Sequence, residues 1–221
     1  MPSGDESKRV TPVAGVSRRR FLRNVGAAAV AAELLDGTAT VRASSQNADA
    51  PTVAPTPEVV SGTTAITLTI NGQSRPVSVE PRTTLLSALR DRLDPAITGP
   101  KLVCDAGTCG ACTVLLDGRA VYGCSLLAID VVGRSIMTVE GFGTPDKLSP
   151  VQAAFCEKDA MMCGFCTSGF VTTVTGLLTK NPDASSEQIR EGCKGNFCRC
   201  GTFPHIFAAA EAAGVVMRKE S

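Results

Sequence analysis

The cysteines of this 221-residue chain are its residues best suited to chemistry, because ten are present and eight fall into two closely spaced groups. The first group follows the pattern C-x4-C-x2-C-x11-C, and the second follows C-x2-C-x31-C-x-C. The members are Cys104, Cys109, Cys112 and Cys124 in the first group, and Cys163, Cys166, Cys198 and Cys200 in the second. Thiolates grouped in fours are ligands for soft metal ions and for iron–sulfur clusters.

The first group opens with the spacing of a plant-type [2Fe–2S] site, in which one loop wraps the cluster and the fourth thiolate comes from a later segment. Gly107 and Gly110 lie in this loop. Glycine permits the tight bends that bring backbone N–H groups towards inorganic sulfide. The spacing therefore predicts a [2Fe–2S] cluster on the first group.

The second group divides into two pairs, and each pair is predicted to lie in a connection between helices. Two such connections can face one another across a bundle, where helix N-termini direct partial positive charge at an anionic cluster. Arg199 stands between Cys198 and Cys200 and places a cation between two ligands. We predict a second [2Fe–2S] cluster here.

Three alternatives explain the cysteines differently. Disulfides suit an exported protein, but this chain is long enough for an ordinary core, and a C-x-C pair is poorly shaped for a bridge. Zinc sites usually show C-x2-C twice, so C-x4-C-x2-C is unusual for zinc. Buried thiols explain single cysteines rather than two spaced groups. Iron–sulfur ligation is favoured, with disulfides and zinc left open.

The first group lies among segments that are predicted to be mostly strands. Alternating apolar residues over 65–70 predict a strand, Asn71-Gly72 predicts a hairpin turn, and Val77 and Val79 predict the returning strand. A helix is expected over 84–93, and further strands over 113–116 and 135–139. Residues 63–143 are therefore predicted to form a small α+β domain with a mostly β framework.

The second group lies among predicted helices. Ser149 with Gln152 and Ser185 with Gln188 form capping boxes, and Pro150 suits the first helical position. The expected helices run over 150–162, 168–180, 185–193 and 203–213, the last ending at Gly214. Residues 146–216 are therefore predicted to form a four-helix domain.

The N-terminus is typical of an export signal over residues 1–43, followed by a Pro-rich linker over residues 44–62. Arg18-Arg19-Arg20-Phe21-Leu22 precedes a short apolar run and resembles a twin-arginine signal. Val41-x-Ala43 offers a cleavage site. That route exports folded protein, as a cofactor inserted before export requires, and it predicts a periplasmic location. The alternative is a basic tail with a chance arginine pair.

The charge distribution argues against nucleic acid as a partner. Residues 1–43 hold seven Lys and Arg against four Asp and Glu, which leaves 15 against 17 in the remainder. Phosphate binding needs clustered cations, and no basic run occurs outside the N-terminus. The single histidine, His205, leaves no nucleophile–base pair, so no catalytic residue is predicted in this chain.

Three motifs resemble the two-cluster iron–sulfur subunit of the xanthine oxidase family of molybdenum hydroxylases. They are Val103-Cys104-Asp105-Ala106-Gly107-Thr108-Cys109-Gly110-Ala111-Cys112-Thr113, Met162-Cys163-Gly164-Phe165-Cys166-Thr167 and Gly195-Asn196-Phe197-Cys198-Arg199-Cys200-Gly201. The resemblance covers residues 64–216 and is greatest to the exported small subunits of periplasmic aldehyde oxidoreductases.

The resemblance implies a β-grasp, plant-type ferredoxin domain followed by a four-helix bundle. It also implies a large partner subunit that holds molybdopterin, where substrate is hydroxylated. Electrons would then pass through the cluster of Cys163, Cys166, Cys198 and Cys200, next through that of Cys104, Cys109, Cys112 and Cys124, and on to FAD, a haem protein such as a cytochrome c subunit, or another acceptor.

Three residues depart from the family pattern or stand outside it. Met162 occupies the position where the family usually carries Gln, whose amide approaches the pterin, and a thioether cannot supply the same hydrogen bonds. Cys156 and Cys193 are not ligands in the family pattern. Both are expected to be buried free thiols on apolar helix faces, with a disulfide between them only if the helices bring them together.

The expected function is therefore one-electron transfer within a molybdenum hydroxylase, with aldehyde oxidation to carboxylic acid as the favoured overall reaction. The alternative is a subunit of an N-heterocycle dehydrogenase acting on xanthine, isoquinoline or nicotinate. A freestanding ferredoxin or iron–sulfur sensor and a disulfide-rich secreted binding module are further alternatives, but a ferredoxin would not need the helical half.

Overall fold

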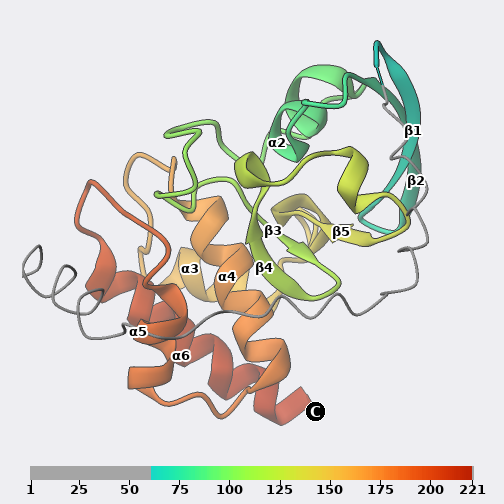
Figure 1. The fold of residues 1–221 in the computed structure, drawn as a ribbon. Helices are drawn as coiled ribbons and strands as arrows, with labels where there is room; N and C mark the ends of the chain where they lie inside the picture. Colours follow the sequence, from blue (N-terminus) through green and yellow to red (C-terminus); the bar gives the residue numbers. More distant parts are fainter. Residues whose placement is uncertain (1–60, 221) are drawn as a thin grey trace, which may run out of the picture. The chain divides into compact units, whose positions relative to one another are not determined.

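The computed structural model describes residues 61–220, which lie within one compact unit (Figure 1). The predicted signal peptide and all but the last two residues of the predicted linker lie outside the described residues. Within them, a mixed sheet is followed by four α-helices, so the α+β prediction is confirmed. In the described part of the chain, no helix combines the length and apolar character needed to cross a membrane.

Five strands form one sheet in the order β2-β1-β5-β3-β4. The strands are β1 (Thr64–Ile70), β2 (Gln73–Val79), β3 (Thr113–Leu116), β4 (Arg119–Tyr122) and β5 (Ser135–Met137). Strands β1 and β5 pair in parallel, and the other neighbours are antiparallel. Asn71 and Gly72 turn the first hairpin with φ angles of 51° and 77°, as the predicted turn requires.

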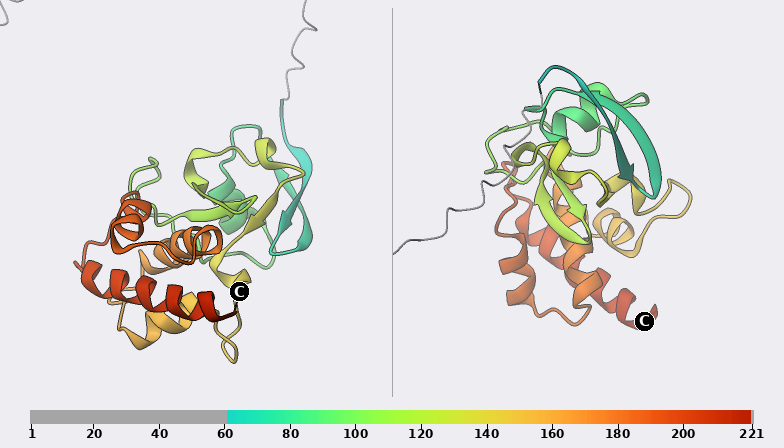
Figure 2. Two further views of the ribbon diagram at one scale, coloured as in Figure 1. Left: turned by 90° about the horizontal axis from the view of Figure 1, so that it is seen from below. Right: turned by 45° about the vertical axis from the view of Figure 1, so that its right-hand side comes forward.

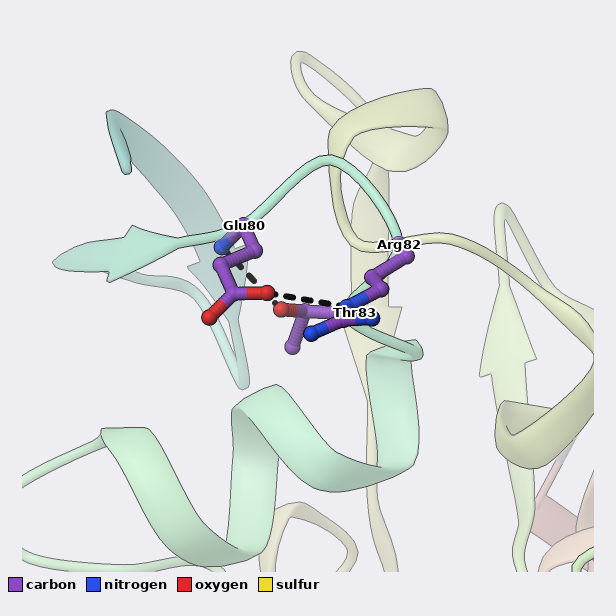
Figure 3. Close-up of polar contacts among 3 residues, drawn as sticks. All are labelled: Glu80, Arg82 and Thr83. Atoms are coloured by element: carbon purple, nitrogen blue, oxygen red, sulfur yellow. Dashed lines mark hydrogen bonds and ion pairs between the residues drawn. The ribbon is translucent and has the colours of Figure 1, made fainter. Parts of the chain in front are cut away.

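A polar turn leads from β2 to the first helical segment. The Thr83 hydroxyl accepts a hydrogen bond from Glu80 N at 3.1 Å, and Arg82 forms an exposed ion pair with Glu80 at 2.9 Å (Figure 3). Thr84 then caps α2 (Leu85–Ser87), which continues as a wider π-helical segment, Ala88–Arg92. The helix predicted over 84–93 is confirmed, and its Leu85 and Leu89 are buried in the core of the sheet half.

The second half contains α3 (Pro150–Glu157), α4 (Thr167–Lys180), α5 (Ser186–Cys193) and α6 (Phe203–Glu220). Both predicted capping boxes are present, at Ser149 and at Ser185. The helices bury a core in which Phe170 contacts Phe203 edge-to-face, with ring centroids 5.9 Å apart. Leu178, Ile189 and Ile206 lie in the same core.

Several predicted boundaries differ from the structure. Helix α3 ends at Glu157 rather than Met162, and Asp159 has a φ of 53°, which is incompatible with continuing a right-handed helix. Helix α6 continues through Gly214 to Glu220. A Cβ on Gly214 would lie 3.1 Å from the Pro182 carbonyl oxygen, so this glycine permits close packing and does not end the helix.

The sheet half also differs in detail from the prediction. Strand β4 was not predicted as a strand, and the predicted strand over 135–139 is shortened to β5. The turns Gly123–Ser125, Ile129–Val131 and Val139–Gly141 are 3₁₀ segments that no periodic pattern marks. Short turns of this kind are set by neighbouring packing, so sequence periodicity does not reveal them.

The two halves pack directly against each other through α4 and β3. All views place α4 beside the β3–β4 hairpin (Figures 1 and 2). A Cβ on Gly176 of α4 would lie 2.7 Å from Leu115 of β3. Gln152 of α3 adds a hydrogen bond, because its Nε2 donates to the Val139 carbonyl at 3.0 Å. The loops at the ends of these elements are thereby held near one another.

Candidate functional site

The first cysteine group occupies the loop before β3 and the 3₁₀ turn after β4. Cys104, Cys109 and Cys112 precede β3, and Cys124 lies within the turn Gly123–Ser125. Cys112 and Cys124 are buried, whereas Cys104 and Cys109 are partly exposed. The fourth cysteine thus reaches the loop because the β3–β4 hairpin folds back on itself. We call this group the first cysteine site.

The loop of the first site bends so that backbone N–H groups face sulfur atoms. Asp105, Gly107 and Gly110 have φ angles of 50°, 67° and 69°. The N–H of Gly107 donates to Sγ of Cys124 at 3.3 Å, and the N–H of Ala106 donates to Sγ of Cys104 at 3.4 Å. Donors in this arrangement stabilise thiolate and sulfide charge, as a bound iron–sulfur cluster requires.

The thiols of the first site differ in acidity. Hydrogen bonds from the Thr108 hydroxyl and backbone lower the pKa of Cys104 to about 6. Burial raises the pKa of Cys112 to about 12. A metal ligand must be a thiolate, so ligation at Cys112 releases a proton while Cys104 is already largely ionised at neutral pH.

The second cysteine group occupies two connections between helices, as predicted. Cys163 and Cys166 lie between α3 and α4, with Cys166 at the N-cap of α4, and Cys198 and Cys200 lie between α5 and α6. Cys198 is buried, Cys166 is partly buried, and Cys163 and Cys200 are exposed. We call this group the second cysteine site.

Burial and hydrogen bonding oppose each other at the second site. Burial raises the pKa of Cys198, but hydrogen bonds from the Thr202 hydroxyl, 3.0 Å from Sγ, and the Thr202 N–H, with smaller ones from Cys166 and the Cys200 backbone, bring it down to about 7. Burial raises the pKa of Cys166 to about 12. Immediately after Cys166, the side-chain oxygens of Thr167 and Ser168 are buried without a hydrogen-bond partner in the described residues.

The thiols of each site interact with one another. Side-chain interactions join Cys104 with Cys109, Cys112 with Cys124, Cys163 with Cys200 and Cys166 with Cys198, and weaker electrostatic interactions join Cys112 with Cys109, Cys166 with Cys163 and Cys200 with Cys198. Among residues 61–220, no three Cys, His, Asp or Glu side chains converge as a site for a single metal ion would require. Four thiols gathered in one site suit a binuclear cluster, in which each iron takes two protein ligands. The donor set and the backbone donors therefore fit [2Fe–2S] better than zinc.

The two remaining cysteines behave differently from each other. Cys193 is buried in the helical core, as expected, and burial raises the pKa of its thiol to about 11. Cys156 is exposed, so the expectation that it would be buried is wrong, because α3 turns this position to the surface. All ten cysteines are free thiols, so neither the Cys156–Cys193 bridge nor a disulfide framework is present.

Large apolar side chains surround the second site on the surface. Met161, Met162, Phe165 and Phe197 are between 52% and 70% exposed. They flank Cys163, Cys166 and Cys198 in the sequence. Grouped exposed apolar residues mark interaction surfaces. Met162 is the most exposed of the four and is therefore free to contact a partner.

Some residues that shape the sites were not predicted. Thr108 and Thr202 lower the pKa values of Cys104 and Cys198. Tyr122 packs against Cys112 and Cys124. A threonine or tyrosine near a cysteine in the sequence is too common to be informative, so only the folded loops reveal these roles.

Comparison with known protein families gives two matches that together span most of the described residues. Residues 68–131 match the family described as "2Fe-2S iron-sulfur cluster binding domain". Residues 138–211 match the family described as "[2Fe-2S] binding domain". The boundary between the matches lies between the first and second cysteine sites.

Two curated proteins illustrate the range of relatives. The aldehyde oxidoreductase iron-sulfur-binding subunit PaoA of Escherichia coli (strain K12) is 40% identical over 214 residues, covering 90% of this chain and 89% of the relative. A nicotinate dehydrogenase subunit of Pseudomonas putida is 43% identical over 156 residues, covering 71% of this chain and 98% of the relative.

Two solved structures of related enzymes are similar to this chain. A chain of quinoline 2-oxidoreductase from Pseudomonas putida 86 superposes with a TM-score of 0.67 at 40% identity, covering 72% of this chain and 98% of that chain. The aldehyde oxidoreductase of Desulfovibrio gigas superposes with a TM-score of 0.67 at 34% identity, covering 72% of this chain and 18% of that much longer chain.

Proposed function

The chain belongs to the [2Fe–2S] small subunits of the xanthine oxidase family of molybdenum hydroxylases, and from this premise we propose how its residues serve electron transfer. It is an enzyme subunit that carries two [2Fe–2S] clusters and transfers electrons, and the substrate is transformed in the partner subunit. The observation that carries the proposal is the grouping of four interacting thiols at each of two sites, with backbone N–H donors facing the sulfurs of the first.

We assign the eight grouped cysteines as the cluster ligands. Cys104, Cys109, Cys112 and Cys124 hold one cluster, and Cys163, Cys166, Cys198 and Cys200 hold the other. Residues 63–143 are the plant-type ferredoxin domain with a β-grasp fold, and residues 146–216 are a four-helix bundle. The sheet with its α2 segment and the four helices α3–α6 support these assignments.

When bound, each cluster supplies reversible one-electron oxidation and reduction. This chain's residues hold that group and set its surroundings. The N–H groups of Ala106 and Gly107 and the hydroxyls of Thr108 and Thr202 donate to ligand sulfurs and so stabilise negative charge. Burial of Cys112, Cys124 and Cys198 limits the access of water. Hydrogen bonds and solvent exposure are the terms that tune such potentials.

The molybdopterin subunit docks over the second site. The exposed Met161, Met162, Phe165 and Phe197 supply an apolar surface beside the exposed thiols of Cys163 and Cys200. Burying this surface against a partner would remove apolar area from water and bring the second site near the partner's cofactor. Electrons then enter at the second site and leave at the first, towards a FAD or cytochrome c subunit or towards another acceptor.

Aldehydes are the proposed substrate class of the complete enzyme. The match to PaoA, which is part of an aldehyde oxidoreductase, covers 90% of this chain, whereas the match to the nicotinate dehydrogenase relative covers 71%. Residues 61–220 make up less than 90% of the chain, so the first match extends into the N-terminal region. The alternative is an N-heterocycle dehydrogenase, which the comparable identity to the nicotinate enzyme supports.

Residues 1–43 act as a twin-arginine signal that directs the folded, cluster-loaded chain to the periplasm. The arginines Arg18, Arg19 and Arg20 before Phe21-Leu22 support this assignment. Export in the folded state lets the clusters be inserted in the cytoplasm. Replacing Arg18, Arg19 and Arg20 with Lys should keep the protein cytoplasmic, which cell fractionation measures, and periplasmic protein after this change would contradict the assignment.

Low-temperature EPR of the full chain tests the central proposal. After reduction, two distinct S = 1/2 signals are expected, together with iron and acid-labile sulfide in equal amounts. Zinc in place of iron, or a single signal, would overturn the two-cluster assignment. Purification with a molybdenum-containing partner would support the role in a larger enzyme, whereas a stable monomer that functions alone would support a freestanding ferredoxin.

A further inference from the structure

The loop that precedes Cys198 is bonded directly to the sheet half of the molecule. The N–H of Phe197 donates to the carbonyl oxygen of Cys109 at 2.9 Å. The Gly195 carbonyl accepts a hydrogen bond from the Tyr122 hydroxyl at 2.8 Å. Residues 195–197, which we call the clamp, thus connect a ligand of the first site to the segment that carries ligands of the second.

Asn196 is the centre of the clamp and is 6% exposed. Its Nδ2 donates to the Gly110 carbonyl at 3.0 Å and to the Thr113 hydroxyl at 3.4 Å. Its Oδ1 accepts a hydrogen bond from the Thr173 hydroxyl at 2.9 Å. One buried amide therefore joins the first-site loop, the start of β3 and the middle of α4, with both donors and the acceptor in use.

The backbone approaches Asn196 too closely to leave room for another side chain. A Cβ on Gly110 would lie 2.6 Å from Nδ2 of Asn196, and Gly110 has a φ of 69°. A Cβ on Gly169 of α4 would overlap the Gly110 carbonyl oxygen. Glycines at these two positions let the loop, the helix and the amide meet, so the separation of the loops is set by direct contact.

We propose that Asn196 is a positioning residue that sets the distance and orientation between the first and second cysteine sites, and thereby the rate at which an electron crosses between them. The proposal rests on the assignment of a cluster to each site. In that crossing, one cluster is oxidised by one electron as the other is reduced, and no covalent bond or proton is exchanged. The Asn196 side chain donates to Gly110 rather than to a cluster ligand. It therefore acts through Gly110 and through the neighbouring Phe197–Cys109 hydrogen bond.

Only an amide meets all the requirements at this position. A carboxylate of the same shape would turn an acceptor towards the Gly110 carbonyl and lose both donors, whereas an aliphatic side chain would leave the Thr173 hydroxyl without its acceptor. Asn196→Asp therefore changes the hydrogen bonds of the clamp with the least change in volume.

The test compares Asn196→Asp with Asn181→Asp in the full chain, with both clusters reduced. Asn181 is the C-cap residue of α4 and lies outside the clamp, so it controls for the added charge and the altered amide. Magnetic coupling between two unpaired spins depends steeply on their separation and orientation. We expect altered spin–spin splitting in the EPR spectrum and a several-fold slower inter-cluster electron exchange in Asn196→Asp only.

Two uncharged variants keep the test decisive if Asn196→Asp fails to fold or to bind iron. Tyr122→Phe removes only the hydroxyl that donates to Gly195, and Thr173→Val removes only the donor to Asn196. Each should shift the splitting in the same direction by a smaller amount, at full iron content.

Unchanged splitting and exchange in every variant that binds both clusters would overturn the positioning role. A change that Asn181→Asp shares would overturn it as well. EPR of the unsubstituted chain distinguishes this outcome from failure of the proposed function. If two cluster signals are absent before any substitution, the cluster assignment itself is contradicted.

Discussion

The first cysteine site closes within residues 104–124, whereas the second joins loops as far apart as residues 163 and 200. The first site is shaped by its own backbone, with left-handed turns at Asp105 and Gly107 and N–H donors facing sulfur. The second depends on where α4 and α6 begin, and therefore on helix packing. A group of four cysteines is thus assembled once by local conformation and once by tertiary contacts.

The largest expected effect comes from disrupting the helical core, on which the second site depends. Phe170→Ala should lower the free energy of unfolding by about 3–5 kcal/mol, because Phe170 is fully buried and packs on Phe203. Urea unfolding measures this loss. The EPR signal of the second cluster should decrease more than that of the first.

The matched change in the sheet half is Leu89→Ala, which removes a fully buried side chain beneath the sheet. It should lower the free energy of unfolding by about 2–5 kcal/mol and weaken mainly the first cluster's signal. Equal loss of both signals in both variants would contradict the separate origins of the two sites.

Backbone conformation at the first site is tested by Gly107→Ala. Gly107 has a φ of 67°, and a Cβ there would lie 2.7 Å from Oγ of Ser125, next to Cys124. The left-handed conformation alone should lower stability by about 1–2 kcal/mol. We also expect a weaker first-cluster signal, with the second unaffected, as measured by EPR and urea unfolding.

Gly133→Ala is the control for strain without crowding, since Gly133 has a φ of 78° and a Cβ there would meet no atom within 4 Å. It should show a similar loss of stability with both cluster signals intact. A weaker first-cluster signal in Gly133→Ala would mean that general destabilisation, and not loop geometry, controls that site.

A smaller effect is expected from the two capping boxes, because only one of them also contacts the other half of the molecule. Gln152 and Gln188 occupy the same capping position, but only Gln152 also donates to the Val139 carbonyl across the two halves. Gln152→Ala should therefore lower the free energy of unfolding by about 1 kcal/mol more than Gln188→Ala, which is the usual net value of one hydrogen bond. Equal losses in urea unfolding would show that the Val139 contact contributes nothing.

The two cysteines outside the two sites should differ in their reactivity with an alkylating reagent, and this difference should not affect the stability of the protein. In the cluster-loaded protein at about pH 8, iodoacetamide should modify the exposed Cys156 and leave Cys193 unmodified. Burial raises the pKa of Cys193 to about 11, so its reactive thiolate is scarce below that pH and becomes accessible only on unfolding. Mass spectrometry of peptides reports both positions, and modification of Cys193 in folded protein would contradict its burial.

Much of the fold could be predicted because it follows from short-range patterns. Alternation over Thr64–Ile70, the Asn71-Gly72 turn and the two capping boxes act through neighbouring residues, and all are present. The end of α6 could not be predicted in this way. A glycine such as Gly214 is typical of a helix end, but here it packs near Pro182 from a distant segment. The exposure of Cys156 depends likewise on the orientation of α3.

The amino-acid sequence by itself determined the two cysteine groups, the order of the sheet and helical halves, and the [2Fe–2S] family to which the chain belongs. The spacing of residues is enough to predict these features, because loop length and turn chemistry act between residues that are close in the sequence. The tertiary structure was needed to show that the thiols of each site interact, that Thr108 and Thr202 lower the pKa values of Cys104 and Cys198, and that Asn196 joins the two sites. The Asn196 contacts join residues far apart in the chain, because the packing of α4 on β3 brings the loops together. Each threonine lies only four residues from its cysteine, but its hydroxyl reaches the sulfur only when the loop is folded.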